Sequence, residues 1–391
     1  MTVSAAPRSL RAGSDLAGVL QGLGAAALRR ELRAPPLLVL VAGMAVYAAV
    51  LTRLALVKHH TFNSAIYDLG IFDQVIWNSA NGRPFATSIF AQHSLDNYLG
   101  EHTSPILLLF VPLYWLHDGA ETLLVTQTLY IAAAALPIYL LGRLWLGSAW
   151  SATALALSYL LQTHVTLINL FDFHPDTLQL LFVPLLFYGF HAGRPRLTLV
   201  VAAASLAVKE DAGLFVAAFG IYAALHSGRR RLGLALILAG ALWFALSIYV
   251  VIPALRAEPY VFLERFEEHG GTPVEIALKL LGDPAATAAL ILTPQKLEYV
   301  VTLLRGLGFT PLLGAPVLVA TAPQFFGNLV SNSAAQWHLS YQYTCIVVAT
   351  FAVAAVRGLE WVMWATGWLA SRAWSSGVRL ARATPLLLSL L

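Results

Sequence analysis

The sequence is poor in cysteine and in charge. Its 391 residues include one cysteine, Cys345, so neither an intramolecular disulfide nor a Cys-x-x-Cys metal knuckle can form. Charged residues make up 11% of the chain, against about 25% in an ordinary soluble domain. The GxGxxG, P-loop, GxSxG, HExxH and kinase signatures do not occur in a suitable context. These absences exclude a soluble globular protein and leave nucleotide hydrolysis and hydrolase-type nucleophilic catalysis without support.

Long apolar runs dominate what is present. Apolar residues make up 58% of the chain, and they gather in runs of about 20, the length that crosses a hydrocarbon core ~30 Å thick. Because the alternating pattern of a membrane β-barrel is missing, we expect helices. The sequence predicts an all-α, polytopic integral membrane protein with about ten transmembrane helices. The candidate spans lie near 36–57, 120–142, 149–170, 176–192, 196–208, 212–226, 232–253, 297–308, 311–327 and 341–359.

The charges predict an orientation. The formal net charge is +4, from 24 basic and 20 acidic residues, and the basic residues are dispersed in short loops, which suits membrane orientation better than nucleic-acid binding. With these loops inside, the protein is a multi-pass protein of the plasma membrane with a cytoplasmic N-terminus. All acidic residues except Asp15, Glu31 and Glu360 then lie outside. Carboxylates contribute little to insertion, so their segregation favours outward-facing chemistry.

Two long outer loops leave room for function. Pro105–His117 has 13 residues and contains Pro112, which makes it too short for a good span, so we place it as an interfacial helix of the first loop. The apolar run Pro385–Leu391 looks interrupted, which is compatible with a longer parent protein. The expected layout is a cytoplasmic segment 1–35, a first transmembrane helix 36–57, a first outer loop 58–119 with interfacial helices, a transmembrane bundle 120–253, a second long outer loop 254–296, C-terminal transmembrane helices 297–360 and a cytoplasmic tail 361–391.

A short amphipathic segment follows the first span. Apolar residues recur at helical spacing within 67–78, and Gly82 is placed to end the helix. Asp68 and Asp73 are five residues apart, about 140° around a helix, so they cannot act as one carboxylate pair. One interpretation is a membrane-surface helix with solvated carboxylates. The other is that Asp68, at the helix start and facing a cavity, is a general base.

A second acidic segment joins the spans near 149–170 and 176–192. Pro175 and Asp176 are ordinary helix-start residues, which leaves Asp172 and His174 unexplained. In an extended segment the side chains of Asp172 and His174 point to the same side. These two residues are candidates for a divalent metal, Mg or Mn, or for a phosphate contact.

Three further segments, 96–102, 209–211 and 336–343, carry polar residues at expected outer ends. A satisfied loop network, a snorkelled ion pair and an aromatic belt explain them structurally. Ionisable residues between spans are also functional candidates by default. The candidate substrate-binding residues are Asp73, Glu101, His102, Lys209, Glu210, His338 and Tyr341.

Five segments resemble the bacterial predicted membrane proteins filed under domain of unknown function 2079. They are YDLGIFDQVIWNSANGRPF, NYLGEHTSPILLLFVPLYWL, NLFDFHPD, VKEDAGL and QFFGNLVSNSAAQWHLSYQY, and the resemblance runs from about residue 60 to residue 356. The layout of that family is similar to the GT-C fold of integral-membrane glycosyltransferases. The resemblance therefore implies a GT-C-like fold with an interfacial-helix loop after the first span.

The resemblance also implies roles for residues. Asp68 falls where the catalytic acid of the GT-C enzymes would be, and Tyr114-Trp115 where their aromatic pair would be. Asp172 and Asp176 occupy the loop that binds a divalent metal in the related oligosaccharyl transferases. The sequence departs from the pattern at Leu69, where a second acid would follow Asp68.

The implied reaction is transfer of a sugar from a polyprenyl-phosphate donor to an acceptor at the outer face, with general-base assistance from Asp68. Lys209, His338 and Arg256 are the candidate contacts of the donor phosphate. Membrane lipids and this donor are the expected partners. The alternatives are a lipid or small-solute transporter or flippase, which should show polar midplane residues and repeated halves, and a non-catalytic GT-C-like membrane protein.

Overall fold

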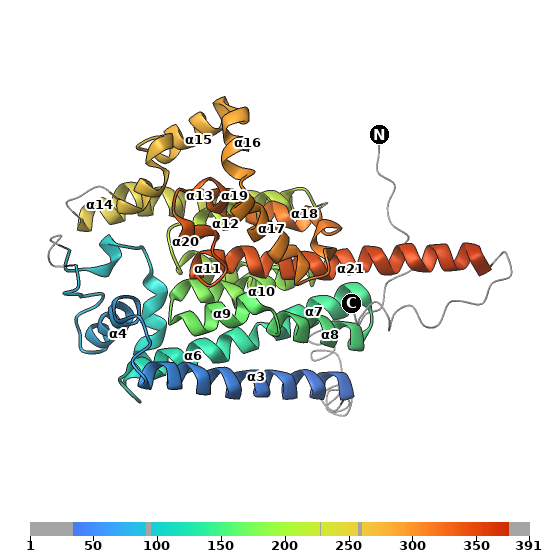
Figure 1. Ribbon diagram of the computed structural model, residues 1–391, viewed down its shortest axis with the longest axis horizontal. Helices are drawn as coiled ribbons and strands as arrows, with labels where there is room; N and C mark the ends of the chain where they lie inside the picture. Colours follow the sequence, from blue (N-terminus) through green and yellow to red (C-terminus); the bar gives the residue numbers. More distant parts are fainter. Residues whose placement is uncertain (1–33, 91–94, 227, 257–259, 375–391) are drawn as a thin grey trace.

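The protein is a bundle of α-helices. The computed structural model describes residues 34–374 apart from 91–94, 227 and 257–259; over these residues its regular elements are helical, and the one strand-like feature is an isolated bridge between Ala86 and Asn97. Long helices run side by side, and shorter ones gather at one end and along one side (Figure 1). The all-α prediction is therefore confirmed for this part of the chain. Nearly all of the expected N-terminal segment 1–35 and the tail beyond residue 374 lie outside the described residues.

Four helical segments are long and apolar enough to cross a membrane. They are Pro35–His60, Ala120–Leu146, Arg230–Leu255 and Gln342–Leu369. A fifth arises if α8 (Ala149–Leu160) and α9 (Thr163–Phe171), which are bent by 45° at their break, count as one span. The chain is thus a helical membrane protein, but the expected number of about ten spans is not confirmed within the described residues.

Several expected spans form helices that are too short to cross a membrane alone. At 1.5 Å per residue, a helix of 13 residues covers about 20 Å of a core ~30 Å thick. Prolines at the starts of α11, α17, α18 and α19 divide the apolar sequence into pieces. The short helices are α10 (Gln179–His191), α11 (Pro195–Leu206), α12 (Ala212–Ala224), α17 (Pro294–Arg305), α18 (Ala315–Leu318) and α19 (Ala322–Val330).

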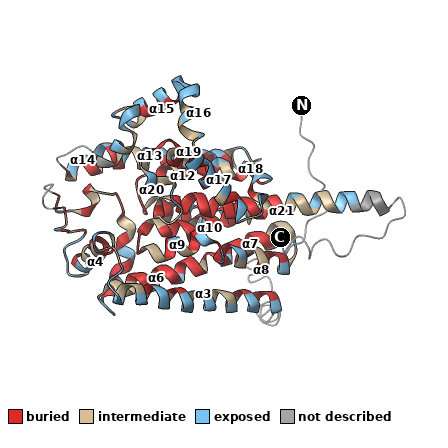
Figure 2. Cartoon of the chain, in the orientation of Figure 1, coloured by how far each residue is buried: buried red, intermediate tan, exposed pale blue. Residues whose placement is uncertain are grey.

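Burial separates a central helix from peripheral ones. Each candidate span contains an apolar stretch of 18 residues. In Gln342–Leu369, which contains most of α21 (Cys345–Trp374), 78% of the stretch is buried. The value is 22% for α3 (Pro35–His60) and 28% for the span that begins with α13 (Arg230–Leu246). Figure 2 shows the same contrast along α21 and α3. Large apolar side chains of α3, such as Val46 at 63% exposure, point away from the protein. Such an exposed apolar face suits contact with lipid.

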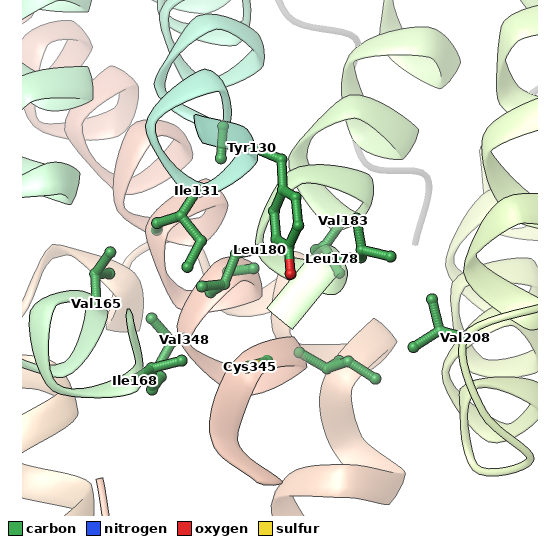
Figure 3. Packing of buried hydrophobic residues seen from close by; sticks show 14 of the residues in the cluster. Tyr130, Ile131, Val165, Ile168, Leu178, Leu180, Val183, Val208, Cys345 and Val348 are labelled. Carbon is green, nitrogen blue, oxygen red and sulfur yellow. The ribbon is translucent and has the colours of Figure 1, made fainter. Parts of the chain in front are cut away.

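Aliphatic side chains fill the junction of four helices. Ile131 of α6 (Ala120–Ala133), Val165 of α9, Val183 of α10 and Val348 of α21 are almost completely buried there (Figure 3). Tyr130 lies among them, and its hydroxyl is 2.5 Å from Thr177 Oγ1. Through this contact the packed core adjoins the polar segment 172–177.

The end of the bundle that carries α4 is called the loop end below (Figure 1). The predicted helix after the first span is confirmed as α4 (Ile66–Ala80), which buries Leu69, Phe72 and Ile76, and the chain turns away after it at Gly82 with φ +78°. The remaining elements are α7 (Ala135–Leu146), η2 (Tyr98–Gly100), η3 (Pro105–Phe110), α5 (Val111–Tyr114), η4 (Pro175–Leu178), η5 (Ser247–Val251), α14 (Ile252–Leu255), η6 (Val261–His269), α15 (Pro273–Gly282), α16 (Pro284–Ile291), η7 (Thr310–Leu312), η8 (Val319–Thr321), α20 (Ala334–Trp337) and η9 (Gln342–Thr344).

The apolar segment expected to be interfacial holds α4 in place. It forms η3 and α5, and the Tyr114 hydroxyl donates to Asp73 Oδ1 at 2.7 Å. Trp115 Nε1 donates to the carbonyl of Ala80 at 3.1 Å, at the last residue of α4. The aromatic pair therefore anchors α4 at two points, one of which engages Asp73.

Candidate functional site

Asp68 and His174 meet at the loop end. Asp68 lies in the first turn of α4, and its Oδ1 is 3.7 Å from Nε2 of His174. The Asp68 side chain is 35% exposed, whereas that of His174 is 4% exposed. The imidazole is stacked on Phe171, with ring centroids 5.3 Å apart, and packs edge-on against Phe72 of α4. A reachable carboxylate thus faces an imidazole whose orientation is set by packing.

Asp172 fixes the start of α4. Lys58, at the end of α3, donates to Asp172 Oδ1 at 2.9 Å, and the backbone N–H of Ala65 donates to Oδ2 at 2.7 Å. The Asp172 side chain is 1% exposed, and its backbone has φ 153°, which strains a residue with a side chain. Each carboxylate oxygen therefore already accepts a hydrogen bond from a group that ties α3 and α4 to the end of α9.

Asp176 faces a lysine. Lys209 Nζ lies 3.4 Å from Asp176 Oδ1 and about equally far from the rings of Phe262 and Tyr343, at 5.9 and 5.6 Å from their centroids. Burial disfavours the charge of Lys209, but Asp176, Asp211 and Glu210 outweigh it and raise the pKa of Lys209. Lys209 is therefore a fixed cation.

Glu210 holds the loops around it together. Its carboxylate is 2.8 Å from His102 Nδ1, accepts from the N–H of Thr103 at 3.0 Å and accepts from the Tyr260 hydroxyl. Burial alone would raise the pKa of Glu210, but His102 and the other partners lower it to about 2. In the same region, Glu101 pairs with Arg256. Contacts within the protein account for Glu101, His102 and Glu210.

The segment 338–341 lies beside the Asp68–His174 pair. Tyr341 packs edge-on against Phe171 with ring centroids 4.7 Å apart, and exposed His338 stands 5.2 Å from the Tyr341 ring. Tyr341 and the imidazole of His174 both pack against Phe171, and His338 packs against Tyr341. The structure thus brings His338 and Tyr341 to one site with Asp68 and His174.

The expected metal ligands do not fit a divalent cation. Within the part of the chain that the structure describes, His, Cys, Asp and Glu side chains form no group of three able to hold a metal ion. The amino group of Lys58 is beside Asp172 and that of Lys209 is beside Asp176, where a positive metal ion would be repelled. Asp172, His174 and Asp176 therefore do not fit Mg or Mn.

Lys209 also lines a cavity of about 470 Å³. Its polar end holds Lys209, Asp211, Arg265 and Tyr343, and its walls are mostly apolar, with residues from α13 to α15 and from α19. Burial raises the pKa of the nearby Tyr98 phenol, and the negative charges of Asp176, Glu210, Glu101 and Asp68 raise it further.

Two cavity residues, Asp211 and Arg265, were not among the expected site residues. Burial raises the pKa of Asp211; Lys209 opposes this rise, but with Asp176 and Glu210 nearby the pKa reaches about 7. Arg265 lies in η6 among acidic residues, a sequence context typical of a solvated surface. The sequence around Arg265 therefore gave no reason to select it as a site residue. Asp211 could have been selected, because it directly follows the candidate residues Lys209 and Glu210.

Comparison with known proteins gives the chain a family and no activity. No curated protein and no solved structure matches the sequence. The description of one family, predicted membrane proteins of domain of unknown function 2079, matches residues 58–391. This match includes α4, the segment of Asp172 and His174, and the whole cavity. The chain therefore belongs to the DUF2079 family of predicted membrane proteins.

Proposed function

We propose that this protein transfers a sugar from a polyprenyl-phosphate donor to an acceptor hydroxyl at the outer face of the plasma membrane, with Asp68 as the general base. The observation that carries the proposal is the partly exposed Asp68 carboxylate 3.7 Å from buried His174. The proposal includes a GT-C-like layout, a cytoplasmic N-terminus and a loop end that faces outward. The family membership supports the membrane location and is neutral on the chemistry.

The chemistry needs one proton acceptor and one displacement. Asp68 takes the proton of the acceptor hydroxyl while the hydroxyl oxygen attacks the anomeric carbon of the sugar. The bond from that carbon to the phosphate oxygen breaks, and the lipid phosphate leaves with the electron pair. His174 Nε2 faces Asp68 Oδ1 and orients the carboxylate or accepts its proton after transfer. Because Asp172 fixes the start of α4, Asp68 is held ready for this role.

Asp68→Asn tests the proposal. The amide cannot accept the proton, so we expect transfer of radiolabelled sugar from a panel of polyprenyl-phosphate hexoses to fall at least about a hundredfold in proteoliposomes. Asp118→Asn is the matched control, because Asp118 is an exposed carboxylate of the same expected outer loop. The proposal fails if the wild type transfers none of these sugars, or if Asp68→Asn transfers them as well as Asp118→Asn does.

A further inference from the structure

The cavity beside Lys209 combines two kinds of surface. Phe244 and Ile248 face it from α13 and η5, and Ile276 and Leu280 face it from α15. The polar lining of the cavity includes the basic side chains of Lys209 and Arg265 together with the acidic side chains of Glu210 and Asp211. A volume of about 470 Å³ is in the range of small-molecule sites, and this division of polar and apolar walls suits an amphiphile with an acidic headgroup.

Arg265 supplies a cation without an acidic partner. Its guanidinium lies 4.5 Å from the centroid of Phe262 and 4.7 Å from that of Tyr343, and it donates to the Tyr343 hydroxyl at 3.1 Å. No carboxylate of the described residues pairs with Arg265. Guanidinium groups bind phosphate oxygens through parallel N–H donors, and among the described residues the Arg265 guanidinium donates to the Tyr343 hydroxyl alone.

Lys209 brings a second positive charge to the same two rings. Its Nζ is 5.9 Å from the Phe262 centroid and 5.6 Å from the Tyr343 centroid. Two cations that share the same aromatic neighbours repel one another unless an anion lies near both. Asp176 pairs with Lys209 and Glu210 pairs with His102, so Arg265 is the basic side chain of the cavity lining that no described carboxylate pairs with.

A buried amide adds an unsatisfied acceptor. Gln324 lines the cavity and is 9% exposed, and its Nε2 donates to the carbonyl of Asp211 at 2.8 Å. Its Oε1 is buried and accepts no hydrogen bond from any described residue. A buried acceptor without a partner is destabilising. Rotation of this amide toward the cavity would let Oε1 accept a hydrogen bond from a ligand hydroxyl.

The wall formed by α15 is apolar on both sides. Ile276 and Leu280 turn inward, whereas Val274, Leu278 and Leu281 are 60, 66 and 75% exposed at helical spacing. In Figure 1, α15 and α16 project sideways from the bundle, close to the loop end. An exposed apolar helix face in this position suits contact with the acyl region of a bilayer and gives a lipid chain a route to the cavity.

We infer that the cavity binds a lipid phosphate with a single hydrocarbon chain, with its phosphate on Arg265 and Lys209 and its chain against α13 and α15. This inference rests on the proposed function, because it assigns the place where the donor is held. It goes further by naming Arg265 as the phosphate contact and Gln324 as a contact for a ligand hydroxyl.

Binding of farnesyl phosphate to the full-length protein in detergent, measured by isothermal titration, tests the inference. We expect Arg265→Gln to weaken binding about tenfold or more, because a charge-assisted pair is lost. Lys279→Gln is the matched control; it removes the same charge from the same loop, but Lys279 is exposed and bonds to the carbonyl of Glu268 outside the cavity. Equal affinity in wild type and Arg265→Gln overturns the inference.

Gly327→Phe tests the apolar part without a change of charge. Gly327 lines the cavity, and a Cβ added there meets no atom within 4 Å, so the ring has room to enter the cavity without a backbone clash. We expect this variant to weaken farnesyl phosphate binding while it keeps the wild-type thermal stability. Unchanged binding in Gly327→Phe shows that the chain lies elsewhere and contradicts the inference.

Two further ligands and one variant identify the source of failure. Inorganic phosphate should bind far more weakly than farnesyl phosphate, and phosphatidylglycerol, with two chains, should not displace it; the opposite result in either case overturns the single-chain assignment. Asp68→Asn should bind farnesyl phosphate like the wild type. If the wild type binds farnesyl phosphate but transfers no sugar, only the proposed function is contradicted. If the wild type transfers sugar but Arg265→Gln binds farnesyl phosphate equally well, only this inference is contradicted.

Discussion

Neighbouring acids at the loop end have opposite properties because their partners differ. Glu210 is surrounded by His102, Thr103 and Tyr260, which lower its pKa to about 2 despite its burial. Asp211 is the next residue and directly precedes α12 without a capping hydrogen bond from its side chain, and burial together with the charges of Asp176 and Glu210 raises its pKa to about 7. Side-chain position, not residue type, therefore decides which carboxylate is ionised at neutral pH.

Asp211 should make thermal stability depend on pH. In the unfolded chain Asp211 ionises near its ordinary pKa of 3.8, and in the folded protein near 7, so its contribution destabilises the fold progressively as pH rises between these values. We expect the melting temperature of Asp211→Asn minus that of the wild type to increase from pH 5 to pH 7 and then to level off. The charged neighbours of Asp211, namely Lys209, Glu210 and Asp176, stay in both proteins.

The difference between the two melting curves isolates Asp211. Glu210, with its pKa lowered from 4.5 to about 2, contributes stability that is lost only as pH falls below this window. Nano-scale differential scanning fluorimetry in one detergent provides the measurement. A difference that stays constant from pH 5 to pH 8 would show that Asp211 ionises normally in the folded protein.

At the scale of elements, a few distant contacts place α4. Lys58 ends α3, Asp172 follows α9 and Ala65 precedes α4, so one buried carboxylate joins three helices. Tyr114 and Trp115 of the segment after η3 hold the other face and the end of α4. The position of Asp68 thus depends on packing among helices rather than on α4 alone.

Removal of Lys58 should destabilise the protein strongly. Lys58→Met leaves Asp172, at 1% exposure, without its charge partner, and breaking such a pair costs about 3–5 kcal/mol when both groups are buried; partial exposure of Lys58, at 27%, should reduce this to about 2–3 kcal/mol. The double variant Lys58→Met with Asp172→Asn should recover much of the loss. Urea unfolding in detergent measures both values. Single and double variants of equal stability would mean that the ion pair does not hold these helices.

At the scale of the whole molecule, polarity divides the two ends of the bundle. The loop end carries the acidic residues of the candidate site and the cavity, whereas arginines such as Arg229 and Arg357 lie at the opposite end over Phe190 and Trp145. The proposed orientation places these arginines on the inner side, as the positive-inside rule requires. The DUF2079 family and the apolar faces of α3 and α13 establish a membrane protein.

Cysteine labelling tests this orientation. The native Cys345 is 1% exposed, so the wild-type protein provides an unreactive background. Leu116→Cys places a thiol at an 85% exposed position of the loop end, and Leu225→Cys places one at a 77% exposed position after α12, at the opposite end. We expect a membrane-impermeant maleimide to label Leu116→Cys in intact cells and Leu225→Cys only after permeabilisation. The reverse pattern contradicts the proposed orientation.

The number of spans marks the limit of hydropathy at this scale. Apolar composition predicted helices at 196–208 and 212–226, and helices are present there as α11 and α12, but each is about half the length of α3. Apolar runs measure burial in general, and they do not distinguish burial in lipid from burial in protein. Most of α12 is buried among other helices, so its side chains are apolar because they pack within the protein. Leu199 and Val200 of α11 are 48 and 67% exposed, so this helix also presents an outward apolar face.

Local pattern determined the helical membrane character, the position of α4 and its end at Gly82, because periodicity and backbone preference act within a few residues. It also pointed to Asp68 and His174 as separate candidates. Only the tertiary structure decided that they face one another, that Lys58 engages Asp172 from 114 residues away, and that Arg265 stands at a cavity. The charge and availability of a buried side chain depend on its spatial neighbours, and those come from distant parts of the chain.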